Sequence, residues 1–126
     1  MSRHLLDTDV MIDVSRGIVA AALFVDSLND VAISIITAHE LIVGAKGKRD
    51  LVGIDALIST YPLAHLDAAI GLLAYDLLKK HAKSDGLRTF DALIAATAME
   101  RGLVLVSRNR KHFTMIDGLR IEVPQF

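Results

Sequence analysis

The chain has 126 residues, a length that predicts one domain spanning residues 1–126. It contains no cysteine, which excludes disulfides, thiol catalysis, thiolate zinc sites and iron–sulfur clusters. The formal net charge of −1 argues against a protein that binds nucleic acid through overall positive charge, so such binding would need a local basic patch or a bound metal.

The chain alternates between short apolar runs and helical patterns. In order, we expect a strand at 4–6, helices at 10–16 and 18–28, a strand at 31–34, helices at 37–44 and 50–59, a strand at 62–64, helices at 68–83 and 90–101, a strand at 103–106, a helical turn at 109–113 and a strand at 120–123. This alternation predicts an α/β fold with a mainly parallel sheet covered on both faces.

The distribution of apolar residues predicts a cytoplasmic protein without a membrane span. No apolar run approaches the roughly 18 residues of a transmembrane helix, and Asp7 comes too early for a signal-peptide core. Hydrophobic residues still make up 52% of the chain, so we expect part of the apolar surface to contact another chain. The segment 18–28, apolar nearly all round, is expected to be buried or to form this partner surface together with the helix after Thr37. A charge placed at Leu23 should then weaken partner binding, unless that side chain belongs to the core.

Polar side chains follow several predicted strands, at the edge where parallel sheets bind ligands. Asp7 follows the first strand, Glu40 lies in the helix after the second, and Ser107 and Asn109 follow the fourth. Topology alone therefore brings Asp7, Glu40 and Asn109 toward one crevice. Asp91 lies in the first turn of the helix before the fourth strand, a position that need not be at the same edge.

Converging carboxylates repel one another unless a cation compensates their charge. Hard oxygen ligands suit Mg²⁺ or Mn²⁺. Such an ion lowers the pKa of a bound water and neutralises charge on a phosphodiester. The acidic residues would therefore serve metal-assisted phosphodiester hydrolysis.

Each of these residues also has an ordinary structural explanation. Asp7 or Asp9 can cap the first helix, and Asp91 can favour the positive end of its own helix. Glu40 forms a capping-box pattern with Thr37, in which the glutamate would bind a backbone N–H. Both interpretations remain open from the residues alone.

The chain resembles PIN domains, and VapC-type toxins in particular, in four ordered segments: LLDTDVMID, TAHELIVGA, FDALIAATAMERGLVLVSRNRKHF and GLRIEVP. The resemblance covers nearly the whole chain, and residues 91–113 are its most specific part. It implies a three-layer α/β/α fold and an endoribonuclease that cuts RNA, often built from dimers and held inactive by a cognate antitoxin. It also implies that Asp7, Glu40 and Asp91 hold Mg²⁺ or Mn²⁺ and position water.

The chain departs from the family pattern near the fourth acidic position. Asn109 stands where many PIN domains have aspartate, and His112 stands where relatives often carry another acid. We therefore expect Asn109 to take part in the site, with one firm metal site and no strong second one. Thr8 and Ser107 are expected to support the site through their hydroxyls.

A basic run lies beside the proposed crevice. Arg108, Arg110 and Lys111, with His112, are expected to contact the RNA backbone, although a solvated basic face is the ordinary alternative.

Two other functions remain open. The sequence Asp7-Thr8-Asp9-Val10 after a strand also fits the opening motif of haloacid dehalogenase-type phosphatases, with Asp7 as nucleophile, although a late acidic motif is missing. A degenerate PIN domain that only binds partners is the second alternative, because Asn109 already replaces one acid.

Overall fold

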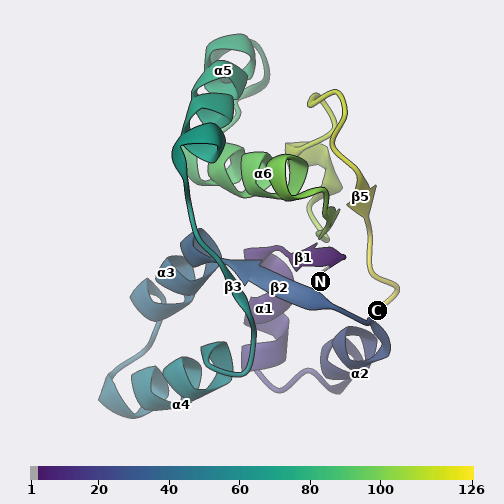
Figure 1. Ribbon diagram of the computed structural model, residues 1–126. Coiled ribbons are helices and arrows are strands. Elements are labelled where there is room, and N and C mark those ends of the chain that lie inside the picture. Colours follow the sequence, from purple (N-terminus) through teal and green to yellow (C-terminus); the bar gives the residue numbers. More distant parts are fainter. Residues whose placement is uncertain (1–2) are drawn as a thin grey trace.

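The computed structural model describes residues 3–126, in which five strands form one sheet surrounded by helices (Figure 1). The strands are β1 (His4–Leu6), β2 (Val31–Ser34), β3 (Leu63–Ala64), β4 (Val104–Val106) and β5 (Ile121–Glu122). The helices are α1 (Thr8–Ser15), α2 (Val19–Ser27), α3 (Ile35–Val43), α4 (Lys48–Ile58), α5 (Ala68–Asp85), α6 (Thr89–Arg101) and the short 3₁₀ helix η1 (Arg110–His112).

Successive strand residues face opposite sides of the sheet, and each side has its own hydrophobic core. Leu5 and Leu105 pack with residues of α5 and α6. Leu6 and Val106 pack instead with residues of α1 to α4. Figure 1 shows α5 and α6 on one side of the sheet and α1 to α4 on the other. The expected three-layer α/β/α architecture is therefore confirmed.

The strand order β3-β2-β1-β4-β5 puts β1 at the centre, and every pairing in the sheet is parallel. Leu6 is in register with Ile33 of β2 and with Val106 of β4. The segments that begin at Asp7 and Ser107 therefore leave the sheet at the same edge, as does the segment that enters α3.

The capping box expected for Thr37 and Glu40 is wrong. Helix α3 begins two residues earlier than expected, because Ser34 caps it by accepting a hydrogen bond of 3.0 Å from the N–H of Ile36. Thr37 consequently lies inside the helix and is fully buried. Glu40 is one turn further along α3 and its side chain is free for another partner.

Helix α2 was expected to be buried or to form a partner surface; it is a surface helix, so the first of these two expectations is wrong. It buries Ala21 and Val25, whereas Val19 and Leu23 are 69% and 64% exposed. Leu23 therefore does not belong to the core, and the interface interpretation of this helix remains. Within residues 3–126, no helix combines the length and apolar character needed to cross a membrane.

Candidate active site

Asp7 joins β1 to α1 at the centre of the sheet edge. Its Oδ1 accepts a hydrogen bond of 2.8 Å from the N–H of Thr8, at the start of α1, for which Asp7 is the N-cap. Its Oδ2 accepts one of 2.7 Å from the buried hydroxyl of Ser107, which follows β4. Asp7 is thus a helix cap and at the same time an acidic residue of the sheet edge, so the two interpretations of its sequence position are compatible.

The surroundings of Asp7 disfavour its negative charge. The pKa of Asp7 is raised to about 7, chiefly by burial and then by the charge of Asp9, while the hydrogen bonds from Ser107 and Thr8 oppose the rise. Burial also raises the pKa of Asp91. Buried carboxylates that repel one another in a cleft are an arrangement that a bound cation would stabilise.

Thr8 connects α1 to Glu40 of α3. Its Oγ1 donates a hydrogen bond of 2.7 Å to Oε1 of Glu40 and lies 3.0 Å from Oγ1 of Thr37. A hydroxyl has one proton, so Thr37 donates to Thr8 while Thr8 donates to Glu40. This relay fixes one carboxylate oxygen of Glu40. The Thr8 hydroxyl, which was expected to support the site, thus contacts a predicted site residue.

The four predicted site residues line the same cleft. It has a volume of about 330 Å³, and Asp7, Glu40, Asp91 and Asn109 all lie in its wall. Asp91 reaches it from the first turn of α6, where Oδ2 lies 4.0 Å from Nδ1 of His112. Topology alone did not fix the edge of the sheet at which Asp91 lies. The structure places it with Asp7, because α6 begins at the edge where β1 and β4 end.

Two further acids of α1, Asp9 and Asp13, bind the loop after β4, a role that was not predicted for them. Asp9 accepts a hydrogen bond of 2.9 Å from the N–H of Arg108, and the guanidinium of Arg108 pairs with the buried carboxylate of Asp13. The guanidinium that was expected to contact RNA is thus directed at α1. The spacing of Asp9 and Asp13, one helical turn apart, was the available signal.

Three consecutive residues before Asp91 also line the cleft and were missed. They are Arg88, Thr89 and Phe90, and they form the wall at the start of α6. The sequence signal that could have identified them is their position directly before a predicted site residue.

The donors in the cleft fit a hard divalent cation. They are carboxylate oxygens and the amide oxygen of Asn109, and carboxylate oxygens retain lone pairs beyond the hydrogen bonds described. Among residues 3–126, no three carboxylate or imidazole groups are close enough to enclose an ion together. Water would therefore have to complete the coordination shell, as it commonly does for Mg²⁺.

Comparison with known proteins identifies the family. The PIN domain family matches residues 4–119. The "tRNA(fMet)-specific endonuclease VapC" of Shigella flexneri is 30% identical, over 97% of this chain and 98% of that protein. The DNA-bound VapBC structure from Salmonella typhimurium has a TM-score of 0.84 at 28% identity, over 98% of both chains. A toxin–antitoxin complex from Klebsiella pneumoniae has a TM-score of 0.78 at 31% identity, over 92% of this chain and 94% of that chain.

These matches decide between the enzyme classes that the sequence left open. They extend over nearly the whole chain, whereas the phosphatase alternative rested on the short motif that begins at Asp7. PIN nucleases generally depend on divalent metal ions, in agreement with the oxygen donors of the cleft. The chain belongs to the PIN domain family and is a VapC-type ribonuclease.

Proposed function

We propose that this protein is the Mg²⁺-dependent endoribonuclease of a toxin–antitoxin pair, acting as one domain over residues 1–126. The observation that carries the proposal is the single cleft that Asp7, Glu40, Asp91 and Asn109 line together at the edge of the sheet. The Shigella relative is named for its action on tRNA(fMet), which makes transfer RNA the first substrate to test. The similar structures are described as toxin–antitoxin complexes, which supports an antitoxin as the partner.

Asp7, Glu40 and Asp91 would hold the ion in part through coordinated water, because the three carboxylates do not enclose an ion by themselves; Mn²⁺ would be its substitute, and Asn109 would add a neutral oxygen. A bound divalent ion supplies acidity to a coordinated water and neutralises charge on the phosphodiester. The remaining task of the protein is to hold its oxygens in place, because catalysis depends on groups fixed before the reaction begins. Ser107 holds Asp7 and Thr8 holds Glu40 through hydrogen bonds of 2.7 Å each.

Glu40 is the residue we assign to orienting the attacking water. Its Oε1 is held by Thr8. Within the described part of the chain, its other oxygen accepts no hydrogen bond from protein and belongs to a side chain that lines the cleft. A carboxylate oxygen in this position can accept a hydrogen bond from water and later a proton.

The exposed apolar surface of α2 and α3 is proposed as the contact for a second copy or for the antitoxin. Val19 and Leu23 of α2 are 69% and 64% exposed, and Val43 of α3 is 84% exposed. Large apolar side chains exposed on a helix are candidates for protein contact.

The proposal is tested by incubating the purified protein with total RNA and with a tRNA(fMet) transcript, in Mg²⁺ or in EDTA. The Asp91→Asn variant removes one carboxylate from the cleft, and Asp76→Asn is the matched control because Asp76 is an exposed acid of α5. We expect discrete cleavage by the wild type and by Asp76→Asn, and none in EDTA or with Asp91→Asn.

Cleavage that persists in EDTA would refute metal dependence, and cleavage by Asp91→Asn would remove that residue from the site. If no RNA is cut, Mn²⁺ binding measured by calorimetry distinguishes a degenerate site from an enzyme with a narrow substrate range. A protein that binds no Mn²⁺ fits the degenerate PIN alternative. One that binds Mn²⁺ retains the metal site and has a narrower substrate.

A further inference from the structure

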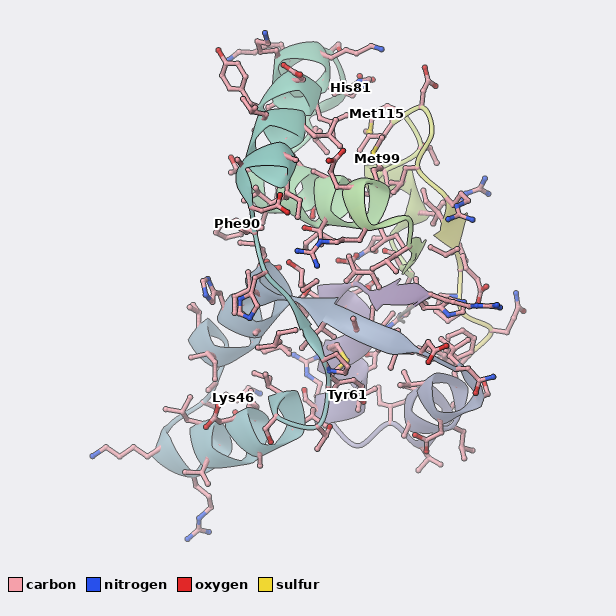
Figure 2. All side chains as sticks on the ribbon, viewed as in Figure 1. Lys46, Tyr61, His81, Phe90, Met99 and Met115 are labelled. Atoms are coloured by element: carbon pink, nitrogen blue, oxygen red, sulfur yellow. The ribbon has the colours of Figure 1, made fainter. Side chains whose placement is uncertain are left out.

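Phe90 is an exposed aromatic side chain in the wall of the acidic cleft. Its side chain is 53% exposed and it directly precedes Asp91 in the first turn of α6. Figure 2 shows it standing out from the start of α6, on the side of the molecule where β2 runs into α3. That side is the edge of the sheet at which the site residues gather.

The other phenylalanines are more buried or packed against one another. Phe113 is fully buried, and the rings of Phe24 and Phe126 lie 5.8 Å apart. Burying a phenylalanine contributes roughly 1.5–3 kcal/mol to stability, and Phe90 gives up much of that contribution. The core side of α6 is formed instead by small and branched residues such as Ala92 and Ile94. The ring at position 90 therefore contributes little to the fold.

A second cleft continues from the acidic one beyond the start of α6. It has a volume of about 310 Å³, and Arg88, Asp91 and His112 line both clefts. The second cleft adds Lys111 and Asp85 to its wall. The two clefts thus form one path that runs past Phe90 and Arg88.

The cations of the second cleft are available for an anionic ligand. Within residues 3–126, neither Arg88 nor Lys111 forms an ion pair. The carboxylate of Asp85 already lies 2.8 Å from His81 Nδ1 and accepts a hydrogen bond of 2.8 Å from Ser84. These two hydrogen bonds already engage one oxygen of Asp85, and Arg88 and Lys111 are the groups of this part of the path that can bind a phosphate.

We propose that Phe90 stacks against a base of the RNA, next to the phosphodiester held at the acidic residues, while the backbone continues toward Arg88 and Lys111. This site rests on the proposed ribonuclease function and specifies its substrate. Proteins that bind unpaired nucleotides combine stacking on aromatic rings with cations along the backbone. A base that stacks on Phe90 has left its own stack, so the substrate class is RNA cut at unpaired nucleotides, such as those of a loop.

The test compares Phe90→Leu, which keeps apolar bulk without a ring, with Phe90→Trp, which keeps the ring. Tyr75→Leu is the matched control, because Tyr75 is an aromatic side chain of α5, 59% exposed and outside both clefts. The substrate is a short single-stranded RNA centred on the cleavage position found in total RNA. A second RNA lacks the base beside that position.

We expect Phe90→Leu to raise KM by about 5- to 150-fold, the equivalent of one lost stacking contact, with kcat changed much less. Phe90→Trp and Tyr75→Leu should keep the wild-type KM. Removing the base should weaken binding by the wild type but not further weaken binding by Phe90→Leu, because both changes remove the same contact. Melting temperatures should stay unchanged, since Phe90 is exposed.

An unchanged KM for Phe90→Leu on the RNA that the wild type cuts would overturn the stacking site alone. Loss of antitoxin binding with unchanged KM would also overturn it and assign Phe90 to a protein contact. A wild-type protein that neither cuts nor binds RNA would overturn the proposed function, and the stacking site with it.

Discussion

The hydroxyl of Ser107 donates a hydrogen bond of 2.7 Å to Oδ2 of Asp7, which joins the end of β4 to the end of β1 inside the acidic cleft. Ser107 is fully buried, and its hydrogen bond lowers the pKa of a carboxyl that burial raises. Ser107 therefore supports the ionised form of Asp7, which is the form that binds a cation.

Ser107→Ala should raise the pKa of Asp7, so that a larger share of the protein is protonated there near neutral pH. Mn²⁺ affinity at pH 6 should fall by on the order of tenfold, because a hydrogen bond to a charged group is lost. The loss should shrink as the pH rises above the pKa. Calorimetry across pH measures it, with the exposed Ser59→Ala as control. Equal affinities at all pH values would show that the hydroxyl has no effect on the carboxylate.

Asp7→Asn should stabilise the metal-free protein at alkaline pH. The pKa of Asp7 in the folded protein, about 7, lies above the ordinary value of 3.8, so the folded state binds this proton more tightly than the unfolded state does. The ionised carboxylate therefore destabilises the fold, fully above the folded pKa and progressively less as the pH falls toward 3.8. A shift of this size corresponds to roughly 4 kcal/mol at most.

Urea unfolding in EDTA measures this effect. The variant should be the more stable protein at about pH 8, and the difference should vanish at about pH 4. Added Mg²⁺ should stabilise the wild type and have little effect on the variant, because the ion binds the folded state through Asp7. A variant that is less stable than the wild type at alkaline pH would contradict the assigned cost of this charge.

Thr8→Val should reduce activity by leaving Glu40 without its donor. The hydroxyl gives Glu40 a hydrogen bond of 2.7 Å and receives one from Thr37, and valine can do neither. Loss of a hydrogen bond to a charged group corresponds to a decrease in kcat of about 10- to 100-fold. Thr8→Ser keeps the hydroxyl and should retain most of the activity. Initial rates on the mapped RNA measure both variants, and similar activities for the two would remove the hydroxyl from the mechanism.

The parts of the site that could be predicted from the sequence follow from the parallel sheet and from the family resemblance. Short apolar strands alternating with helices predicted that residues after β1 and β4 would meet, so Asp7 and Asn109 were placed by topology. Apolar periodicity did not show where α3 begins, because its cap, Ser34, is also the last residue of β2. The error moved Thr37 to a helix start and gave Glu40 the wrong partner.

Burial could not be predicted where the sequence pattern has two physical outcomes. The segment of α2 is apolar nearly all round, which indicates that its faces favour burial but not whether the core or another chain covers them. In the structure Val19 and Leu23 remain at the surface. Phe90 illustrates the same limit, since an apolar residue beside Asp91 in a helix pattern would ordinarily be assigned to the core.

Arg108→Ala should destabilise the protein, because it leaves the carboxylate of Asp13 buried and without its cation. The loss should be roughly 1–3 kcal/mol, below that of a fully buried pair because the Arg108 side chain is about half exposed. Arg110→Ala is the matched control in the same loop, and Asp13→Asn combined with Arg108→Ala should recover part of the loss. Urea unfolding measures these differences. Unchanged stability with weaker RNA binding and a smaller salt dependence would assign Arg108 to the RNA instead.

Asn109→Asp should strengthen metal binding by adding a negative charge to the cleft. The wild type has the carboxylates of Asp7, Asp9, Glu40 and Asp91 and the neutral amide of Asn109 in this wall. Asp9 already accepts a hydrogen bond from the N–H of Arg108, so we expect the other three acids to bind one Mn²⁺ ion tightly. An additional carboxylate at position 109 should raise the affinity by roughly tenfold or add a second bound ion, since attraction between opposite charges at short range is strong in a partly buried site. Asn109→Ala should weaken binding if the amide oxygen is a ligand. Calorimetric titration gives both affinity and stoichiometry, and two tight Mn²⁺ sites in the wild type would show that the neutral amide does not limit the site to one ion.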